Sequence, residues 1–153
     1  MTGTVTARLA ELGIELPTVA APLAAYVPAA RSGSLVFTSG QLPFVDGALA
    51  ATGKVGGEVG PEEAKGHARL CALNALAAVH ALVGIDSVVR VVKVVGYVAS
   101  AEGFTGQPAV INGASELLGE VFGEAGQHAR AAVGVAELPL GAPVEVELVV
   151  EVA

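Results

Sequence analysis

The chain of 153 residues is poor in several residue types, and each shortage excludes a class of structure or function. The single cysteine, Cys71, excludes an intramolecular disulfide and favours a cytoplasmic protein. Aromatic residues make up 4% of the chain, which leaves few side chains on which single-stranded bases could stack. The eight Lys and Arg residues are scattered singly under a net charge of -7, so no basic stripe follows a phosphate backbone. Nucleic acid is therefore not an expected partner.

Long apolar runs and several catalytic motifs are missing as well. Hydrophobic residues make up 53% of the chain, but Gly and charged residues interrupt them before the roughly 20 residues of a membrane span. No secretory signal is visible, and a soluble protein without a membrane partner is expected. Residues 53–57 do not precede a helix as a phosphate-binding loop does, and there is no Gly-x-Ser-x-Gly elbow. His67 and His80 have no Cys or carboxylate set at ligand spacing, so no metal site is expected. No cofactor is expected either.

The patterns that are present predict a single α+β domain over residues 1–153, with residues 1–20 as an N-terminal extension. Thr4 is placed to cap a short helix that ends near Leu12. Two long helices are expected, one from Pro61 to a stop at Gly84 and one over residues 107–122. The apolar stripe of the first comprises Ala68, Ala72, Ala75, Leu76, Val79, Leu82 and Val83. Strands are expected at residues 24–28, 34–38, 88–99, 131–138 and 144–152, with a turn at 31–33 and a loop holding at most a short hairpin at 45–60.

This order of elements predicts a mixed sheet with two helices on one face. The valine-rich run 88–99 indicates a strand that is covered on both faces. In residues 144–152 the side chains alternate, so valines meet the helices while Glu145, Glu147, Val149 and Glu151 share the other face. A face that mixes carboxylates with valine in so apolar a chain predicts a subunit interface, closed by cyclic symmetry.

Arg130 is the most informative single residue. It lies in a run of small residues, Gly126–Val135, and two carboxylates follow on the next strand. A lone guanidinium in such a place suits a pocket for a small anion. The alternative is an arginine at the edge of the sheet that forms a surface ion pair and contributes little to stability.

Several blocks, taken in order, resemble the reactive intermediate deaminase family, also called the YjgF-like or Rid family, in its longer branch that begins Leu-Gly-Ile-Glu-Leu-Pro. The resemblance runs from about Leu12 to the C-terminus. Its blocks are Tyr26-Val27-Pro28, Phe37 to Pro43, Val110 to Ser115, Ala129-Arg130, and Leu138-Pro139 before Val144 to Glu147. It implies a chorismate-mutase-like fold, a homotrimer with clefts between subunits, and hydrolysis of 2-aminoacrylate-type enamines and imines to 2-keto acids and ammonia.

The resemblance also implies roles for individual residues. Arg130 matches the arginine that binds the substrate carboxylate, and Glu145 matches an acidic residue that orients or activates water, with Glu147 as the fallback. The expected substrate-binding positions are Tyr26, Ser39, Gly40, Asn112, Arg130 and Ala132. His128 stands where it could reach the mouth of the pocket.

Simpler interpretations stand beside these roles. Tyr26 would be a boundary residue, Ser39 and Gly40 a strand exit, Asn112 a solvated helix position, and His128 an exposed loop residue. Glu145 would only neutralise Arg130. Many family members have a cysteine where this chain has Ala132, which excludes thiol chemistry there. The functions to compare are a deaminase, a non-catalytic trimeric protein that binds small carboxylates and, last, an endoribonuclease or translation inhibitor.

Overall fold

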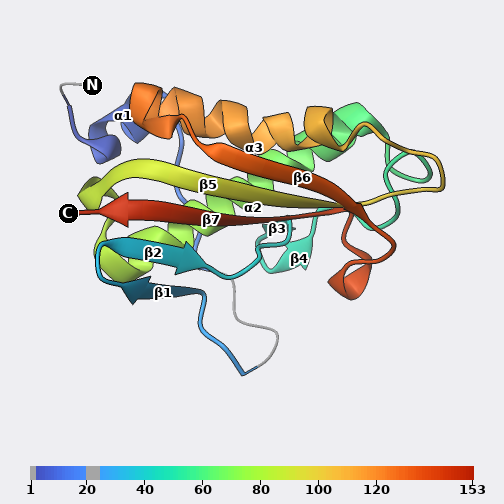
Figure 1. Cartoon of the computed structure of the whole chain (residues 1–153), viewed down its shortest axis with the longest axis horizontal. Coiled ribbons are helices and arrows are strands. Elements are labelled where there is room, and N and C mark those ends of the chain that lie inside the picture. The colour runs from blue at the N-terminus through green and yellow to red at the C-terminus, as the bar shows by residue number, and fades with distance from the viewer. Residues whose placement is uncertain (1–2, 20–24) are drawn as a thin grey trace.

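The computed structural model of the chain describes residues 3–19 and 25–153, and a five-stranded mixed sheet forms its centre (Figure 1). The strands run in the order β1-β2-β7-β5-β6. Their bounds are β1 Ala29–Ser32, β2 Leu35–Thr38, β5 Val88–Ala99, β6 Ala129–Val135 and β7 Val144–Val152. Neighbouring strands are antiparallel except β5 and β6, which are parallel and joined by a helix, as a parallel pair requires. The predicted α+β class with a mixed sheet is confirmed.

The helices and short elements complete the fold. Helices α2 (Pro61–Val83) and α3 (Gln107–Phe122) pack on one face of the sheet, as predicted, and α1 (Val5–Glu11) lies against α3. A hairpin of β3 (Phe44–Val45) and β4 (Ala48–Leu49) occupies the predicted loop. Single 3-10 turns lie at Ile85–Ser87, Gly123–Gly126 and Pro139–Gly141. At the N-terminus the Thr4 hydroxyl accepts a hydrogen bond from the Ala7 amide at 3.0 Å, which confirms the predicted cap.

Helix α2 is the central element of the core. Proline at its first position and Gly84 at its C-cap, with φ of 80°, set the predicted bounds. Most of the predicted stripe is buried, but Leu82 is 46% exposed because it lies past the end of the sheet-facing surface in the last turn. The helix is long and apolar enough to cross a membrane by length and composition, contrary to the expectation that no segment would be. Because 56% of that window is buried inside the fold, α2 has the place of a core helix.

Helix α3 packs closely against the sheet and against α2, and a glycine permits each contact. Gly96 of β5 faces α3 on the sheet, and Gly113 of α3 faces α2. A Cβ at Gly96 of β5 would run into the Ile111 side chain, and a Cβ at Gly113 would run into the Lys65 carbonyl. Its apolar positions Val110, Ile111, Ala114, Leu117, Leu118, Val121 and Phe122 are buried, as the periodicity predicts. This close packing fixes where α3 presents its polar residues.

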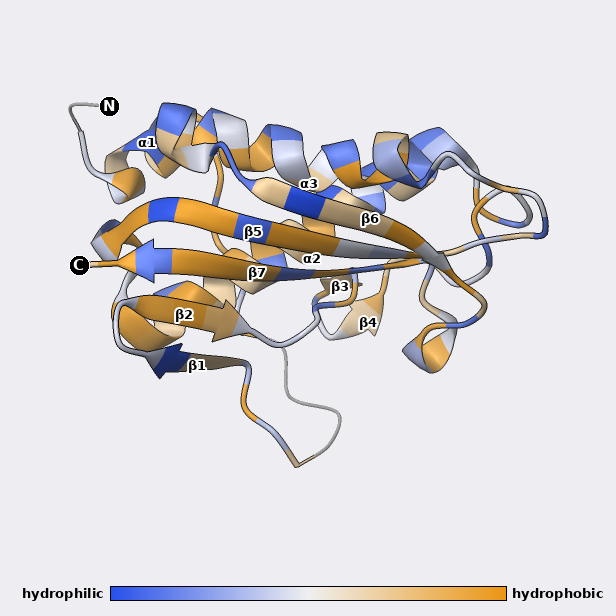
Figure 2. Cartoon of the chain, in the orientation of Figure 1, coloured by the Kyte–Doolittle hydropathy of each residue, from blue (hydrophilic) through white to orange (hydrophobic). Residues whose placement is uncertain are grey.

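The second face of the sheet is covered by no helix of the described chain. Along β7 the residues alternate between fully buried and half-buried, as predicted, and apolar residues dominate β5 and β7 (Figure 2). On the uncovered face Phe37 is 45% exposed and Val133 is 44% exposed. The expected cover on both faces of β5 is therefore not supplied within one chain.

The strand predicted at residues 24–28 is wrong, because residues 25–28 form no strand, and the strand predicted at 131–138 has different bounds. The first begins at Ala29 rather than at 24, because a two-residue turn at Gly33-Ser34, with Gly33 at φ 61°, pairs Ser32 directly with Leu35. Residue 24 lies outside the described residues. The strand expected at 131–138 is β6, Ala129–Val135, because its parallel pairing with β5 ends where β5 ends at Ala99.

Candidate functional site

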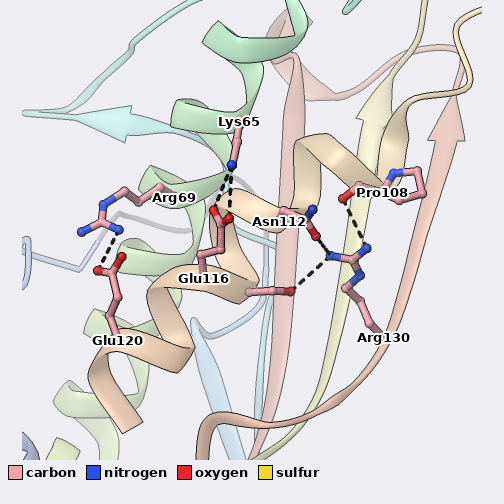
Figure 3. Close-up of polar contacts among 8 residues, drawn as sticks. Lys65, Arg69, Pro108, Asn112, Glu116, Glu120 and Arg130 are labelled. Carbon is pink, nitrogen blue, oxygen red and sulfur yellow. Dashed lines mark hydrogen bonds and ion pairs between the residues drawn. The ribbon is translucent and has the colours of Figure 1, made fainter. Parts of the chain in front are cut away.

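Arg130 lies in β6 and points toward α3 (Figure 3). Its partner on β5 is the buried Val94, so its side chain leaves the sheet on the face that the helices cover. Nη1 donates to Asn112 Oδ1 at 2.8 Å and to Ser115 Oγ at 3.3 Å, and Nη2 donates to the Pro108 carbonyl at 3.2 Å. We call Pro108, Asn112, Ser115, His128 and Arg130 the arginine cluster.

The charge of Arg130 has no ionic partner in the described part of the chain. All three acceptors are neutral, and none of the ion pairs found among residues 3–19 and 25–153 includes it. The alternative of a surface ion pair is therefore wrong for this chain. A half-buried cation with neutral partners is a favourable place for an anion from outside.

The hydrogen bonds of Arg130 also select the edge that an anion would meet. A guanidinium has five N–H groups. Both on Nη1 and one on Nη2 are used, which leaves the Nε–H and one Nη2–H without a further acceptor among the described residues. Nε and Nη2 lie on the same edge of the guanidinium. This edge matches the two oxygens of a carboxylate.

His128 belongs to this cluster through Ser115. Its Nε2 lies 2.9 Å from Ser115 Oγ and its Nδ1 lies 2.6 Å from the Gly126 carbonyl oxygen. The alternative of an exposed loop histidine is therefore wrong, because the ring is half-buried and both nitrogens are in contact. Ser115 was not singled out from the sequence, although its spacing of three residues from Asn112 puts both on one helix face.

A second group of polar residues lies on the uncovered face of the sheet. The Tyr97 hydroxyl of β5 donates to Glu147 Oε1 of β7 at 2.9 Å, and Glu145 is paired with Tyr97 in the register. The Glu145 carboxylate lies against the backbone of Gly40, where a Cβ would run into it. We call Gly40, Tyr97, Glu145 and Glu147 the glutamate cluster. The sequence analysis did not identify Tyr97, because its place in this cluster depends on the register between β5 and β7, which the sequence does not specify.

Two groups of the glutamate cluster, the Glu145 carboxyl and the Tyr97 hydroxyl, have raised pKa values. Burial, with a further contribution from the Glu147 charge, raises the pKa of the Glu145 carboxyl above its ordinary value. Burial and then the hydrogen bond to Glu147 raise the pKa of Tyr97 to about 12. A carboxyl with a raised pKa binds its proton more firmly than an ordinary carboxyl does.

Ser39 and Tyr26 lie beside the glutamate cluster in sequence. The Ser39 hydroxyl donates to the Val27 carbonyl at 2.6 Å, and the Ser39 amide donates to the Pro28 carbonyl at 2.8 Å. Ser39 thus fastens the segment that carries Tyr26, which is 45% exposed, to the exit of β2. Ser39 and Gly40 do form a strand exit, and Gly40 in addition makes room for the Glu145 carboxylate.

The two clusters lie on opposite faces of the sheet. Ala132 is on the helix side with Arg130, since its β5 partner is Gly96 under Ile111, whereas Glu145 is on the uncovered side. From Arg130 to Glu145, two strand spacings of about 4.8 Å and three residues of about 3.3 Å give roughly 14 Å between the Cα positions in the plane of the sheet. Glu145 therefore does not neutralise Arg130 within one chain.

The remaining titratable residues form no metal-binding group within the described residues. Cys71 is buried in α2, its thiol donates to the Val144 carbonyl at 3.6 Å, and burial raises its pKa well above the ordinary value. His67 contacts Glu63 at 3.3 Å, and His80 accepts a hydrogen bond from the Ile85 amide.

Comparison with known proteins agrees with the fold. A family model described as "YjgF/chorismate mutase-like, putative endoribonuclease" matches residues 6–152. Protein TCP17 of Trypanosoma cruzi is 48% identical over 151 residues, 97% of this chain and 94% of that protein. A crystal structure described as protein Atu1372, of unknown function, from Agrobacterium tumefaciens has a TM-score of 0.90 and 47% identity, covering 97% of this chain and 92% of that one. RidA from the Antarctic bacterium Psychrobacter has a TM-score of 0.64 and 28% identity, covering 88% and 94%. The chain belongs to the YjgF-like, or Rid, family.

Proposed function

We propose that the protein hydrolyses small enamines and imines of the 2-aminoacrylate type to 2-keto acids and ammonia. The observation that carries the proposal is the guanidinium of Arg130, which is held by three neutral acceptors while one edge stays open for a carboxylate. Membership of a family that includes RidA supports the same chemistry. The reaction needs no cofactor, because water is the only other reactant.

The proposed reaction site lies between subunits of a homotrimer. Arg130 and Glu145 point to opposite faces of one sheet, so a cleft that contains both needs the arginine cluster of one chain and the glutamate cluster of its neighbour. The exposed Phe37 and Val133 on the uncovered face supply apolar surface for such an interface. Tyr26, Ser39 and Gly40 would enter the cleft with Glu145, and Asn112 and Ala132 with Arg130.

The proposed reaction uses the two clusters for different tasks. The substrate carboxylate binds the Nε and Nη2 edge of Arg130, which holds the imine carbon in one place. The Glu145 carboxylate takes a proton from water as the water oxygen bonds to that carbon, and the C=N electron pair moves to nitrogen. Glu145 then returns the proton to nitrogen, which gives a carbinolamine. A second proton passes from the carbinolamine hydroxyl to nitrogen through Glu145, the C–N bond breaks, and ammonia leaves as the hydroxyl oxygen becomes the carbonyl oxygen of the 2-keto acid. An enamine enters this sequence as its imine tautomer. The raised pKa of Glu145 supports this exchange of a proton.

The test is turnover of imines generated in the assay. 2-Aminoacrylate and 2-iminobutyrate are produced in situ, and release of the keto acid is compared for the wild type, Arg130→Ala and Arg69→Ala. Arg69 is the matched control because it pairs with Glu120 on the outer surface of α2 and α3 (Figure 3). We expect acceleration by the wild type and by Arg69→Ala, and its loss in Arg130→Ala. Equal rates with and without wild-type protein would overturn the proposal.

A second candidate is a non-catalytic trimeric protein that binds small carboxylates. It is favoured by the completeness of the arginine cluster within one chain, since anion binding needs no contribution from Glu145. Binding of pyruvate without turnover of any imine would select it. An endoribonuclease, the activity named in the family description, stays last because the net charge of -7 opposes an RNA backbone.

A further inference from the structure

A continuous chain of hydrogen-bonding groups runs from the backbone at Gly126 to Arg130. The Gly126 carbonyl contacts His128 Nδ1 at 2.6 Å, His128 Nε2 contacts Ser115 Oγ at 2.9 Å, and Ser115 Oγ accepts from Arg130 Nη1 at 3.3 Å. Its members come from the 3-10 turn after α3, the first residues before β6, α3 itself and β6. These elements are thus tied together at one guanidinium.

The hydrogen bonds from Gly126 to Arg130 allow one consistent assignment of donors and acceptors when His128 is neutral. A carbonyl oxygen can only accept, so the Nδ1 of His128 must carry a proton, and in the neutral ring Nε2 is then an acceptor. The Ser115 hydroxyl therefore donates to Nε2, and its oxygen is turned toward Arg130 with a lone pair to accept Nη1–H. Without His128 the hydroxyl would be free to rotate or to donate to a carbonyl of its own helix.

We propose that His128, acting through Ser115, is a positioning residue that holds Nη1 of Arg130 and so presents the Nε and Nη2 edge to the carboxylate of a ligand. The identity of that ligand rests on the proposed function, whereas the restraint on the guanidinium does not. An arginine side chain fixed before binding loses less rotational freedom when the ligand arrives, and the affinity is higher for that reason. Asn112 alone would fix one Nη1–H and leave the other without an acceptor.

The first arm of the test measures the guanidinium directly by nuclear magnetic resonance of the ligand-free protein. Exchange between the two Nη signals of Arg130 reports how fast the group rotates. We expect separate signals in the wild type and in Gln127→Ala, which changes the exposed neighbour of His128. In Ser115→Ala and His128→Phe the rotation should be about tenfold faster, the change expected when one hydrogen bond to a charged group is lost. Ser115→Thr, which keeps the hydroxyl, should restore the wild-type rate.

The second arm measures binding of pyruvate by calorimetry. Ser115→Ala and His128→Phe should each raise the Kd about tenfold. In an Arg130→Ala background neither should change it further, because a residue that acts only through Arg130 has nothing left to position. In steady-state assays the same variants should raise KM and leave kcat nearly unchanged, since the carboxylate contact is equal in the ground and transition states.

The outcomes separate the two proposals. Unchanged rotation of Arg130 in both variants would overturn the positioning role, whatever happens to turnover. Faster rotation in a protein that neither binds pyruvate nor turns over imines would support the positioning of the guanidinium and overturn the proposed function. Should Ser115→Ala fail to fold, His128→Phe carries the same test from the other end of the chain of contacts.

Discussion

Replacing Gly113 with alanine should destabilise the protein, because this glycine is where α3 touches the backbone of α2. A Cβ there would run into the Lys65 carbonyl. That oxygen belongs to a helix backbone and cannot swing aside as the end of a side chain could. Overpacking of this kind costs about 1–3 kcal/mol, and alanine recovers only about 1 kcal/mol of helix propensity. We expect the two helices to separate slightly and a net loss in the free energy of unfolding of up to about 2 kcal/mol.

Gly119 gives the matched control within the same helix. No atom lies within 4 Å of a Cβ built at Gly119, so Gly119→Ala should gain the propensity term alone, about 0.5–1 kcal/mol. The assay is urea unfolding of both variants and the wild type at one protein concentration, because association would make the midpoint depend on concentration. For a domain of this length each kcal/mol corresponds to about 2–4 °C in Tm.

The test is whether each variant is less or more stable than the wild type. Gly113→Ala should lie below the wild type and Gly119→Ala above it. If the two substitutions raised stability equally, the close contact of α2 and α3 would not exist in solution. Asn112, which accepts a hydrogen bond from Arg130, directly precedes Gly113. Displacement of α3 in Gly113→Ala should therefore also weaken pyruvate binding at Arg130.

Three further predictions concern the two clusters. Arg130→Lys should weaken pyruvate binding nearly as much as Arg130→Ala, because the planar fork is lost although the charge stays, and retention of affinity by the lysine in calorimetry would contradict a two-point contact. Glu145→Gln should lower turnover of 2-iminobutyrate and leave pyruvate binding largely intact. If Glu147→Gln lowered turnover and Glu145→Gln did not, the catalytic carboxylate would be Glu147. Because the folded pKa of Glu145 is raised, its contribution to stability is complete below its ordinary pKa of 4.5 and is lost as pH rises through the folded pKa. In urea unfolding, the stability of Glu145→Gln should therefore increase relative to the wild type across that range, and a constant difference at all pH values would argue against burial of this carboxyl.

The helices and the last strand were predictable because their signals are local. Proline at the first turn of α2 and glycine at its end act within a few residues, and α3 has the bounds that its apolar period indicates. The alternation in β7 identifies which face is buried without knowledge of its neighbours. The first strand was misplaced because the turn at Gly33-Ser34 is shorter than the one assumed, and turn length sets the register of a hairpin.

The site was only partly predictable, because its geometry depends on pairings between distant strands. Arg130, Asn112 and Ala132 do share one side of the sheet, and Gly40 does lie against Glu145. The sequence could not show that these are two separate groups. That follows from the registers of β5 with β6 and with β7, which are set by contacts between residues far apart in the chain.

The separation of the two clusters has a physical advantage for an anion site. Had Glu145 lain within reach of Arg130 in the same chain, the carboxylate would have paired with the guanidinium, and a ligand would have had to displace it. The structure instead holds Arg130 with neutral oxygens and keeps Glu145 on the other face, where burial and the Glu147 charge raise the pKa of its carboxyl. An assembly that joined the two faces would therefore bring a proton donor and acceptor to the cleft without filling the edge of Arg130 that the substrate needs.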